Sequence, residues 1–191
     1  GMPGKLSNSA AIGHVRYSTT GATKAVNSQP FLSEYSRGQV AVAHNGNLIN
    51  APLLRDEYEA YGHIFKSTSD TEIIIHLLAK PSHINKHDPL AHVLNHLQGA
   101  YSLLFLFADH IEAARDPYGV RPLSIGRTES GAYVIASETC AFDTVGAEYV
   151  RDIEPGEIVR LDKDGLHSRF FVTPGSGTPG HCIFEHVYFA K

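Results

Sequence analysis

The chain has 191 residues, 42% of them hydrophobic and 19% charged, and its formal charge is −4. This composition is typical of one globular domain, and without a dense Lys/Arg stripe it argues against nucleic acid or an anionic membrane as a partner. The longest apolar stretch, Tyr101 to Ala108, is less than half a membrane span, no secretory signal is evident, and the two cysteines make no disulfide framework, so we expect a cytoplasmic protein.

The first half of the chain predicts a strand and several helices. Regular structure is expected to begin at 12–17, before a polar loop over 18–30. A strand is predicted over Gln39–His44, where Val40 and Val42 share one face. Helices are predicted where apolar residues recur at helical spacing or follow a capping box, namely over Leu53–Tyr61, over Ile73–Leu78 after the box Ser69–Glu72, and over Leu90–Leu97.

The second half predicts short strands separated by Gly, Pro and Asp turns. They are expected at Tyr101–Phe107, Ile111–Arg115, Leu123–Gly126, Ala132–Ala136, Glu157–Leu161 and Leu166–Val172. Early helices followed by antiparallel strands favour an α+β layered fold over a parallel βαβ fold. The segment Thr173–Gly180 is rich in Pro, Gly and Ser and is interpreted as a linker.

The segment His44-Asn45-Gly46-Asn47 has two interpretations. Asn-Gly is the strongest two-residue signal for a hairpin turn, but the residues after Leu48 suggest a loop and a helix rather than a second strand. Alternatively, the Asn45 side-chain amide and the Gly46 backbone N–H form an oxyanion hole, since glycine permits close approach. The sequence alone leaves both open.

Arg16 and Asp70 each have a structural and a functional interpretation. Arg16 leads into a hydroxyl-rich loop that includes Thr19, so it is either an exposed side chain or a bidentate clamp for a carboxylate under a closing loop. Asp70 stands in the first turn of a predicted helix, where the macrodipole favours an acid. The same carboxylate can also hold a substrate ammonium group.

The twelve histidines include two pairs with a spacing of four residues, His83/His87 and His92/His96. On a helix this spacing supplies half of a zinc site. Because no Cys or acidic partner is grouped with these pairs in the sequence, and because His92 and His96 lie off the apolar face, we expect a solvated surface and no metal.

Neither cysteine has the surroundings expected of a nucleophile. Cys140 lies in a small-residue stretch and is predicted to be a packed core thiol. Cys182 follows the predicted linker, and its only close candidate partner is the adjacent His181.

In order along the chain, several strings together resemble the glutaminase domain of the amidophosphoribosyltransferase family, also called glutamine phosphoribosylpyrophosphate amidotransferases. The resemblance runs from about Pro3 to Lys191. The strings are Gly13-His14-Val15-Arg16-Tyr17, Ala43-His44-Asn45-Gly46-Asn47-Leu48, Thr68-Ser69-Asp70-Thr71-Glu72, Arg115-Asp116-Pro117-Tyr118-Gly119-Val120-Arg121-Pro122-Leu123, Ala136-Ser137-Glu138 and Phe184-Glu185-His186-Val187-Tyr188-Phe189-Ala190.

This resemblance implies a fold and a chemistry. The fold is the four-layer α/β/β/α sandwich of N-terminal-nucleophile hydrolases. In the family, an N-terminal cysteine attacks the side-chain amide of glutamine, its own α-amine acts as general base, and ammonia passes to a phosphoribosyltransferase domain that makes phosphoribosylamine for purine synthesis. By resemblance, Arg16 binds the substrate α-carboxylate, Asp70 the α-amine, Asn45 and Gly46 form the oxyanion hole, and Thr19 lies in the closing loop.

The sequence also departs from the family pattern. Residue 1 is Gly rather than Cys, and the opening strands and the pyrophosphate-binding half are not found, so we expect an incomplete sandwich with exposed strand edges that favour a homo-oligomer. We assign 1–172 to a partial class II glutamine amidotransferase domain and 173–191 to a linker and the start of the transferase domain. Some family members hold an iron–sulfur cluster with a ligand at the position of Cys182, but no cofactor is expected in this chain. The expected function is that of a glutaminase fragment, inactive as it stands; the alternative is a non-catalytic glutamine-binding or interaction module.

Overall fold

The larger of two sheets forms the centre of the molecule. In the computed structural model, which describes residues 10–15 and 25–173, six antiparallel strands pair in the order β1-β2-β3-β4-β8-β9. They are β1 (Phe31–Tyr35), β2 (Gly38–Leu48), β3 (Gly99–Leu106), β4 (Ile111–Arg115), β8 (Glu157–Asp162) and β9 (Gly165–Phe170). The longest of them, β2, continues past the end of β1 and carries the residues of greatest interest.

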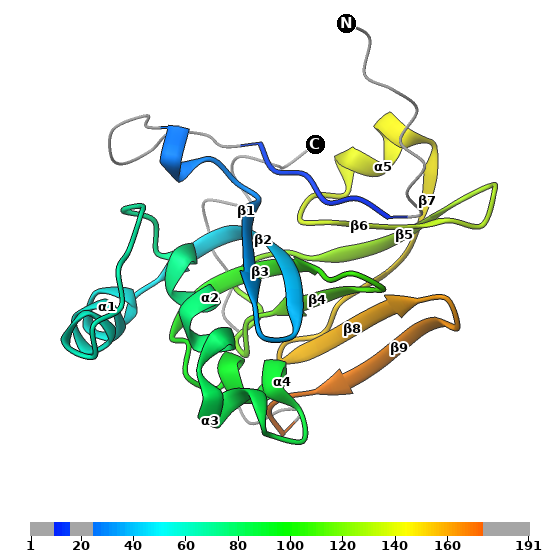
Figure 1. Cartoon of the computed structure of the whole chain (residues 1–191). Helices are drawn as coiled ribbons and strands as arrows, with labels where there is room; N and C mark the ends of the chain where they lie inside the picture. Colours follow the sequence, from blue (N-terminus) through cyan, green and yellow to red (C-terminus); the bar gives the residue numbers. More distant parts are fainter. Residues whose placement is uncertain (1–9, 16–24, 174–191) are drawn as a thin grey trace, which may run out of the picture.

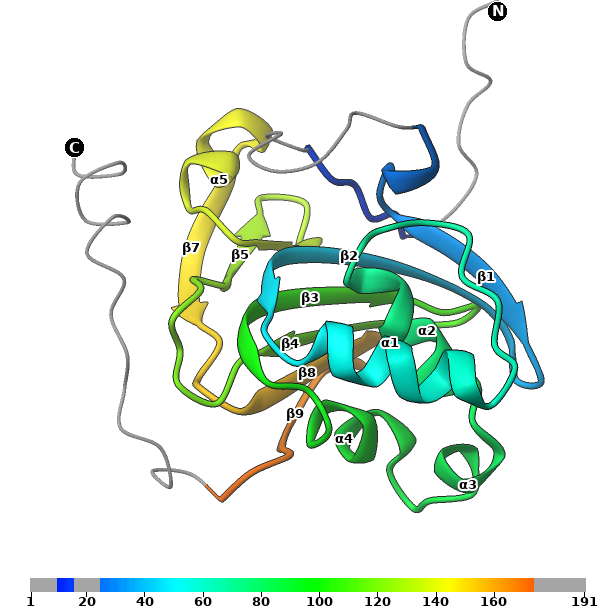
Figure 2. The ribbon, with the colours of Figure 1, turned by 90° about the vertical axis from the view of Figure 1, so that its left-hand side faces the viewer.

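Four helices cover one face of this sheet (Figures 1 and 2). They are α1 (Ala51–Ala60), α2 (Thr71–Ala79), α3 (Pro81–Ile84) and α4 (Pro89–Leu94). Side chains alternate across a strand, so Leu103 and Phe105 of β3 point toward the helices and join the same buried cluster as Ile74 and Leu77 of α2. Among the described residues, no helix is long and apolar enough to cross a membrane.

A second sheet packs against the other face. It has the order β6-β5-β7, from β5 (Ser124–Thr128), β6 (Tyr133–Ala136) and β7 (Ala147–Asp152). Ile125 of β5 shares a buried cluster with Ala113 of β4 and Val159 of β8, whose neighbours Ala114 and Ile158 face the helices instead. Beyond this sheet lies α5 (Cys140–Val145), whose Phe142 ring would be 3.0 Å from a Cβ placed at Gly126. The layers are therefore helices, sheet, sheet and helix, the order that the resemblance implies.

Most of the predicted elements are confirmed. The strand at Gln39–His44, the helices near Leu53, Ile73 and Leu90, and all six strands predicted in the second half are present, most of them with shifted ends. The sequence analysis missed β1, α3, α5, β7 and a short 3-10 helix at Ala25–Asn27. Residues 12–15 form neither helix nor strand, so the prediction of regular structure there is wrong as far as the described residues extend. The helix predicted over Leu53–Tyr61 ends at Ala60, and Tyr61 is exposed.

The predicted capping box at Ser69 does not form. The Ser69 hydroxyl accepts a hydrogen bond from the Thr71 N–H at 3.3 Å, but Glu72 reaches further back along the chain. Its carboxylate accepts hydrogen bonds from the N–H groups of Lys66 and Ser67, both at 2.8 Å. Glu72 thus fixes the loop before the helix, rather than the helix start itself.

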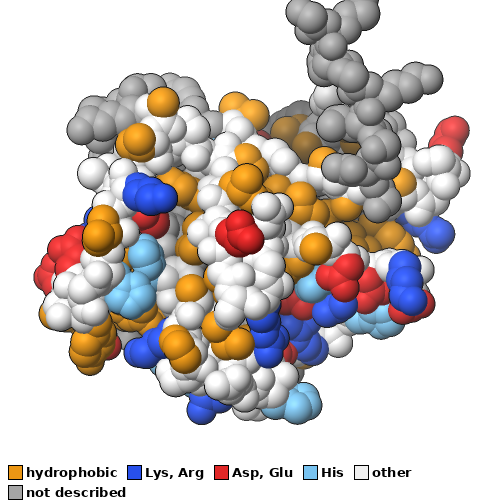
Figure 3. All heavy atoms as spheres, in the orientation of Figure 1, with side chains coloured by type: hydrophobic (Ala, Val, Ile, Leu, Met, Phe, Trp, Pro, Cys, Tyr) orange, Lys and Arg blue, Asp and Glu red, His pale blue; other side chains and the backbone are white. Residues whose placement is uncertain are grey.

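Charged side chains on the outer strands of the large sheet form ion pairs. Arg169 of β9 bridges Asp88 and Glu112, and Arg160 of β8 pairs with Asp162 at 2.8 Å. The face drawn in Figure 3 shows acidic and basic side chains intermixed, with no large patch of one sign.

Candidate functional site

The outer edge of β2 is free of β1 where the Asn45-Gly46 segment lies. Among the described residues, β1 pairs with β2 only from Gly38 to Val42. Alternate N–H groups of a strand point to the same edge, so those of His44, Gly46 and Leu48 all point away from β3. The His44 N–H donates to Oε1 of Gln29 at 2.6 Å, and the Leu48 N–H donates to Oδ2 of Asp70 at 3.0 Å. The Gly46 N–H lies between these two occupied positions.

The pairing with β3 does not use that Gly46 N–H. Gly46 stands opposite Tyr101, but both backbone groups of Tyr101 are directed to the other side of β3. The Tyr101 N–H donates to Oδ2 of Asp116 at 3.3 Å, and its carbonyl accepts from the Asp116 N–H at 2.9 Å. The hairpin interpretation of Asn45-Gly46 is therefore wrong, because β2 continues through these residues to Leu48. The Gly46 N–H is directed away from β3, where it can donate to another group.

Gly46 also lies where no side chain can fit. Its φ of +150° is rarely adopted by residues with a side chain. A Cβ at this position would collide with the Ala100 carbonyl oxygen and lie 2.8 Å from the Tyr101 Cα. A glycine is required here by the close approach of β2 and β3.

The Asn45 side chain is oriented by an arginine that the sequence analysis had not considered. Nη2 of Arg121 donates to Oδ1 of Asn45 at 2.7 Å. Because this contact assigns the amide oxygen to the arginine, the Nδ2 donors of Asn45 are turned the other way. Asn45 is thus held as a hydrogen-bond donor, the role that an oxyanion hole requires.

The loop that presents Arg121 is fixed by buried charged groups. Asp116 is fully buried and accepts hydrogen bonds from the N–H groups of Tyr118, Val120 and Arg121 at 3.0, 3.2 and 3.1 Å. Arg115 donates to the Arg121 and Gly119 carbonyls, both at 2.8 Å. The string Arg115–Pro122 is therefore a rigid support for Arg121, and its turn-forming Asp-Pro-Tyr-Gly core was the signal that could have suggested it.

Asp70 is anchored to the same strand edge. Besides the Leu48 N–H, its carboxylate lies 3.6 Å from Nδ1 of buried His44, and the Asp70 side chain remains 27% exposed. Thr71 donates its hydroxyl to Oδ1 of Asp70 at 3.4 Å. Gln29, whose Nε2 donates to Thr71 Oγ1 at 3.3 Å, joins the start of α2 to β2.

The pKa of Asp70 lies below the usual value of an aspartate. Burial by itself raises this pKa, but the hydrogen bond and charge interaction with His44 and the Leu48 N–H outweigh burial. The carboxylate is therefore ionised at neutral pH and partly open to solvent, as a group that binds an ammonium ion has to be.

An open pocket of about 390 Å³ adjoins Asp70. It is lined by Asn47, Leu48, Ala51, Pro52, Arg55, Thr68, Ser69, Asp70 and Ile73, so it lies between the end of β2 and the starts of α1 and α2. Thr68 is held in this wall by Asn27, whose Nδ2 donates to the Thr68 hydroxyl at 3.0 Å. The pocket is large enough for an amino acid and carries the Asp70 carboxylate on its wall.

The structure brings together three of the five predicted site residues. Asn45, Gly46 and Asp70 all lie along the last five residues of β2 or bond to them. Arg16 and Thr19 lie outside the described residues, as does Cys182. The prediction for Cys140 is wrong, because its thiol is exposed at the start of α5 rather than packed in the core. Phe142 is the one buried residue of this short helix.

Comparison with known proteins identifies the family. Residues 14–144 match the model of the glutamine amidotransferase domain. The chain belongs to the glutamine amidotransferase domain family. Its relatives include an amidophosphoribosyltransferase of Vigna aconitifolia, named as chloroplastic, with 50% identity over 97% of this chain and 38% of the relative. An amidophosphoribosyltransferase of Bacillus subtilis is 43% identical over 98% of this chain and 39% of the relative.

Solved structures of amidotransferases agree with this assignment. The glutamine phosphoribosylpyrophosphate amidotransferase of B. subtilis, complexed with ADP and GMP, superposes with a TM-score of 0.83 at 42% identity and covers 93% of this chain and 38% of that one. The fold is thus the N-terminal-nucleophile type of α+β sandwich, as the resemblance implies. The chain spans 38–39% of the length of the Vigna and Bacillus relatives and corresponds to their glutaminase part.

Proposed function

We propose that this amidotransferase domain binds glutamine at the free edge of β2 and, with an N-terminal cysteine supplied, releases ammonia from its side-chain amide. The ammonia is used by a phosphoribosyltransferase domain to make phosphoribosylamine for purine synthesis. The observation that carries this proposal is the hydrogen bond from Arg121 to Oδ1 of Asn45. It directs the Asn45 amide N–H groups away from Arg121, next to a Gly46 N–H that the pairing with β3 does not use.

The roles follow from the charges on the two ends of glutamine. The Asp70 carboxylate pairs with the substrate α-ammonium group, and Arg16 pairs with the α-carboxylate under a loop that contains Thr19. The side-chain amide then extends along β2, where Nδ2 of Asn45 and the N–H of Gly46 stabilise the oxyanion of the tetrahedral intermediate. Only the Asp70, Asn45 and Gly46 assignments draw support from the described residues.

We also propose that the amidotransferase domain comprises 1–172 and that 173–191 is a linker leading toward the transferase domain. The pairing of β9 with β8 up to Phe170, and the burial of Phe171 in the main core, support a boundary after these residues. A cytoplasmic location and self-association remain predictions, and the Vigna relative is named as chloroplastic.

Two measurements test the proposal in sequence. First, calorimetric titration of the 191-residue chain with L-glutamine should show binding that D-glutamine does not reproduce. Second, ammonia release should be absent from this chain, since neither Cys140 nor Cys182 has a free α-amine. Ammonia release should appear in a version extended upstream, along its own coding DNA, to the first in-frame cysteine after a Met.

The outcomes separate the two candidate functions. Ammonia from the extended chain supports the glutaminase. Glutamine binding without ammonia from either folded chain would instead identify a non-catalytic glutamine-binding module. Binding of neither glutamine enantiomer by either folded chain would refute both.

A further inference from the structure

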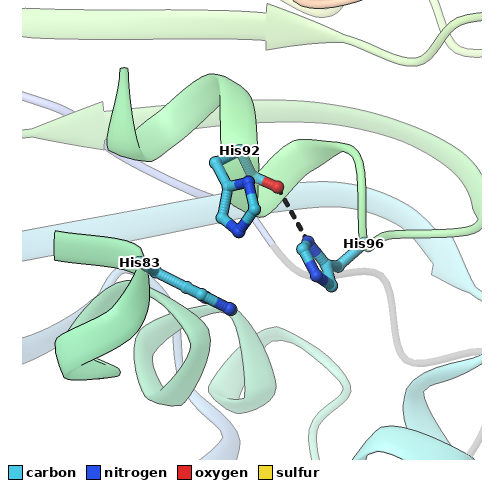
Figure 4. Close-up of side chains that lie close together, drawn as sticks. All are labelled: His83, His92 and His96. Carbon is cyan, nitrogen blue, oxygen red and sulfur yellow. Dashed lines mark hydrogen bonds between the residues drawn. The ribbon is translucent and has the colours of Figure 1, made fainter. Parts of the chain in front are cut away.

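Three histidines from separate parts of the sequence converge beside α3 and α4 (Figure 4). His83 lies in α3, His92 in α4, and His96 in the turn that follows α4. Their ring centroids are 4.7 Å apart for His83 and His92, 4.9 Å for His83 and His96, and 4.7 Å for His92 and His96. One nitrogen of each ring lies within 4.8 Å of one nitrogen of each of the other two.

The expectation of a solvated histidine surface is wrong for His83 but holds for His87 and His96, which are exposed. His83 is only 4% exposed, and its partners are His92 and His96 rather than His87, which is exposed on the connecting loop. Of the two pairs with a spacing of four residues, His92 and His96 lie together, whereas α3 ends at Ile84 and His83 and His87 do not share a helix face.

Backbone hydrogen bonds leave ring nitrogens of this cluster available. Nδ1 of His83 is 2.9 Å from the Leu77 carbonyl oxygen, and Nδ1 of His96 is 2.8 Å from the His92 carbonyl oxygen. A carbonyl can only accept, so each Nδ1 carries the proton and each Nε2 presents a lone pair. Such a backbone partner on the second ring nitrogen is the usual support of a metal-binding histidine.

The surroundings favour the neutral imidazoles that metals require. Burial lowers the pKa of His83 below its usual value, and the neighbouring His96, His92 and Lys80 lower it further. The hydrogen bond to the Leu77 carbonyl raises this pKa but does not outweigh those effects. The pKa of His92 is also lowered, by burial and then by His96 and Lys86.

We propose that His83, His92 and His96 form a binding site for Zn²⁺ or a similar divalent transition metal, with water as the fourth ligand. Imidazole nitrogens suit Zn²⁺, which binds them at about 2.0–2.1 Å in tetrahedral geometry and accepts three histidines and a water. Closing the cluster to that geometry requires ring shifts on the order of 1 Å. His96 is exposed, so its ring can shift without displacing core side chains, while His83 and His92 must also approach each other. The bound ion would join α3 to α4 and the turn after it.

This site is separate from the proposed glutamine site. Among the described residues, the pocket at Asp70 is lined by the end of β2 and the starts of α1 and α2, and none of the three histidines contributes to it. The proposal of a metal site therefore does not depend on the glutaminase proposal, and each can be tested without the other.

The test uses Zn²⁺ alone with the 191-residue chain, stripped by a chelator and free of any polyhistidine tag. After dialysis we expect one zinc per chain and a higher Tm with zinc than without. His92→Gln and His96→Gln should each weaken zinc binding by more than about 100-fold, since changing a group that only hydrogen-bonds to a metal ligand already costs about 10–100-fold. His87→Gln, which replaces an exposed imidazole on the loop between α3 and α4, is the matched control and should bind like the parent.

His83→Gln is expected to have the same effect, but its burial makes folding a separate question. The two less buried histidines therefore carry the test, with circular dichroism confirming that each variant is folded. Stoichiometric zinc that persists in both His92→Gln and His96→Gln would overturn the proposal. So would equal weakening by His87→Gln, or the absence of zinc from the folded parent chain.

Discussion

Replacing Gly46 by alanine tests whether β2 and β3 approach as closely as the structure indicates. The added Cβ would collide with the Ala100 carbonyl oxygen, which is backbone and cannot rotate away, and would lie 2.8 Å from the Tyr101 Cα. Gly46 also has a φ of +150°, which an alanine adopts only under strain. The central strand pair of the sheet would have to separate or shift locally.

The expected cost combines two contributions. Residues held at an unfavourable φ cost about 1–3 kcal/mol, and overpacking costs about 1–3 kcal/mol more. The sum of roughly 2–6 kcal/mol is a large part of the 5–15 kcal/mol that stabilises a typical domain. We therefore expect Gly46→Ala to unfold at markedly lower urea and to lose glutamine binding even where it remains folded.

Gly38→Ala is the matched control on the same strand. Gly38 has a φ of +105°, but a Cβ there would meet nothing within 4 Å, so this change carries the strain without the collision. Urea unfolding of the parent and both variants measures the difference. A Gly46→Ala variant no less stable than Gly38→Ala would refute the close approach of β2 and β3.

Three further predictions concern charged groups. Asp70→Asn keeps an oxygen that accepts from the Leu48 N–H but loses the negative charge. Glutamine affinity should therefore fall about 10- to 100-fold, which corresponds to the roughly 1.5–3 kcal/mol of a hydrogen bond to a charged group. Calorimetric titration measures this loss, with Asp56→Asn, a change at an exposed aspartate, as the control. Arg121→Ala removes the donor to Asn45 but leaves the backbone hydrogen bonds of its loop in place. In the chain extended to carry an N-terminal cysteine, kcat should fall by at least about 10-fold, toward the roughly 10²- to 10³-fold loss seen when an oxyanion-hole donor is removed, while KM changes little. Arg127→Ala is the control and should leave kcat unchanged. The pKa of Glu157 is held below the usual 4.5, because hydrogen bonds from Arg151, Ser168 and the Glu154 N–H outweigh the effect of burial. As the pH falls below about 5, the unfolded chain therefore takes up protons before the folded chain does. The free energy of unfolding should then fall by up to about 1.4 kcal/mol per pH unit because of this group. Urea unfolding between pH 3 and 6 should show a shallower decline in Glu157→Gln, and an unchanged slope would contradict the assignment.

Periodicity identified the elements whose apolar residues meet the core. Val40 and Val42, and the row Leu90, Val93, Leu94 and Leu97, are buried as their spacing predicts, because burial of one face is what produces the pattern. The elements missed lie where this signal is weak. Strand β1 is at the edge of its sheet and alternates only between partly buried and exposed residues, and β7 leaves most of its residues exposed.

The sequence by itself determined the family, since its strings occur in the family's order, and it named Asn45, Gly46 and Asp70 as site residues. It could not decide between a hairpin turn and an oxyanion hole at Asn45-Gly46, because that depends on whether a distant segment pairs with the strand. The direction of two donors is set by the pairing with β3, by the start of β1 opposite Val42, and by the hydrogen bond from Arg121 to Asn45, which lies 76 residues earlier in the chain. The histidine cluster is likewise a tertiary property: His83 meets His92 and His96 only because α3 and α4 pack side by side, and side-chain spacing within one helix contains no information about the packing of two.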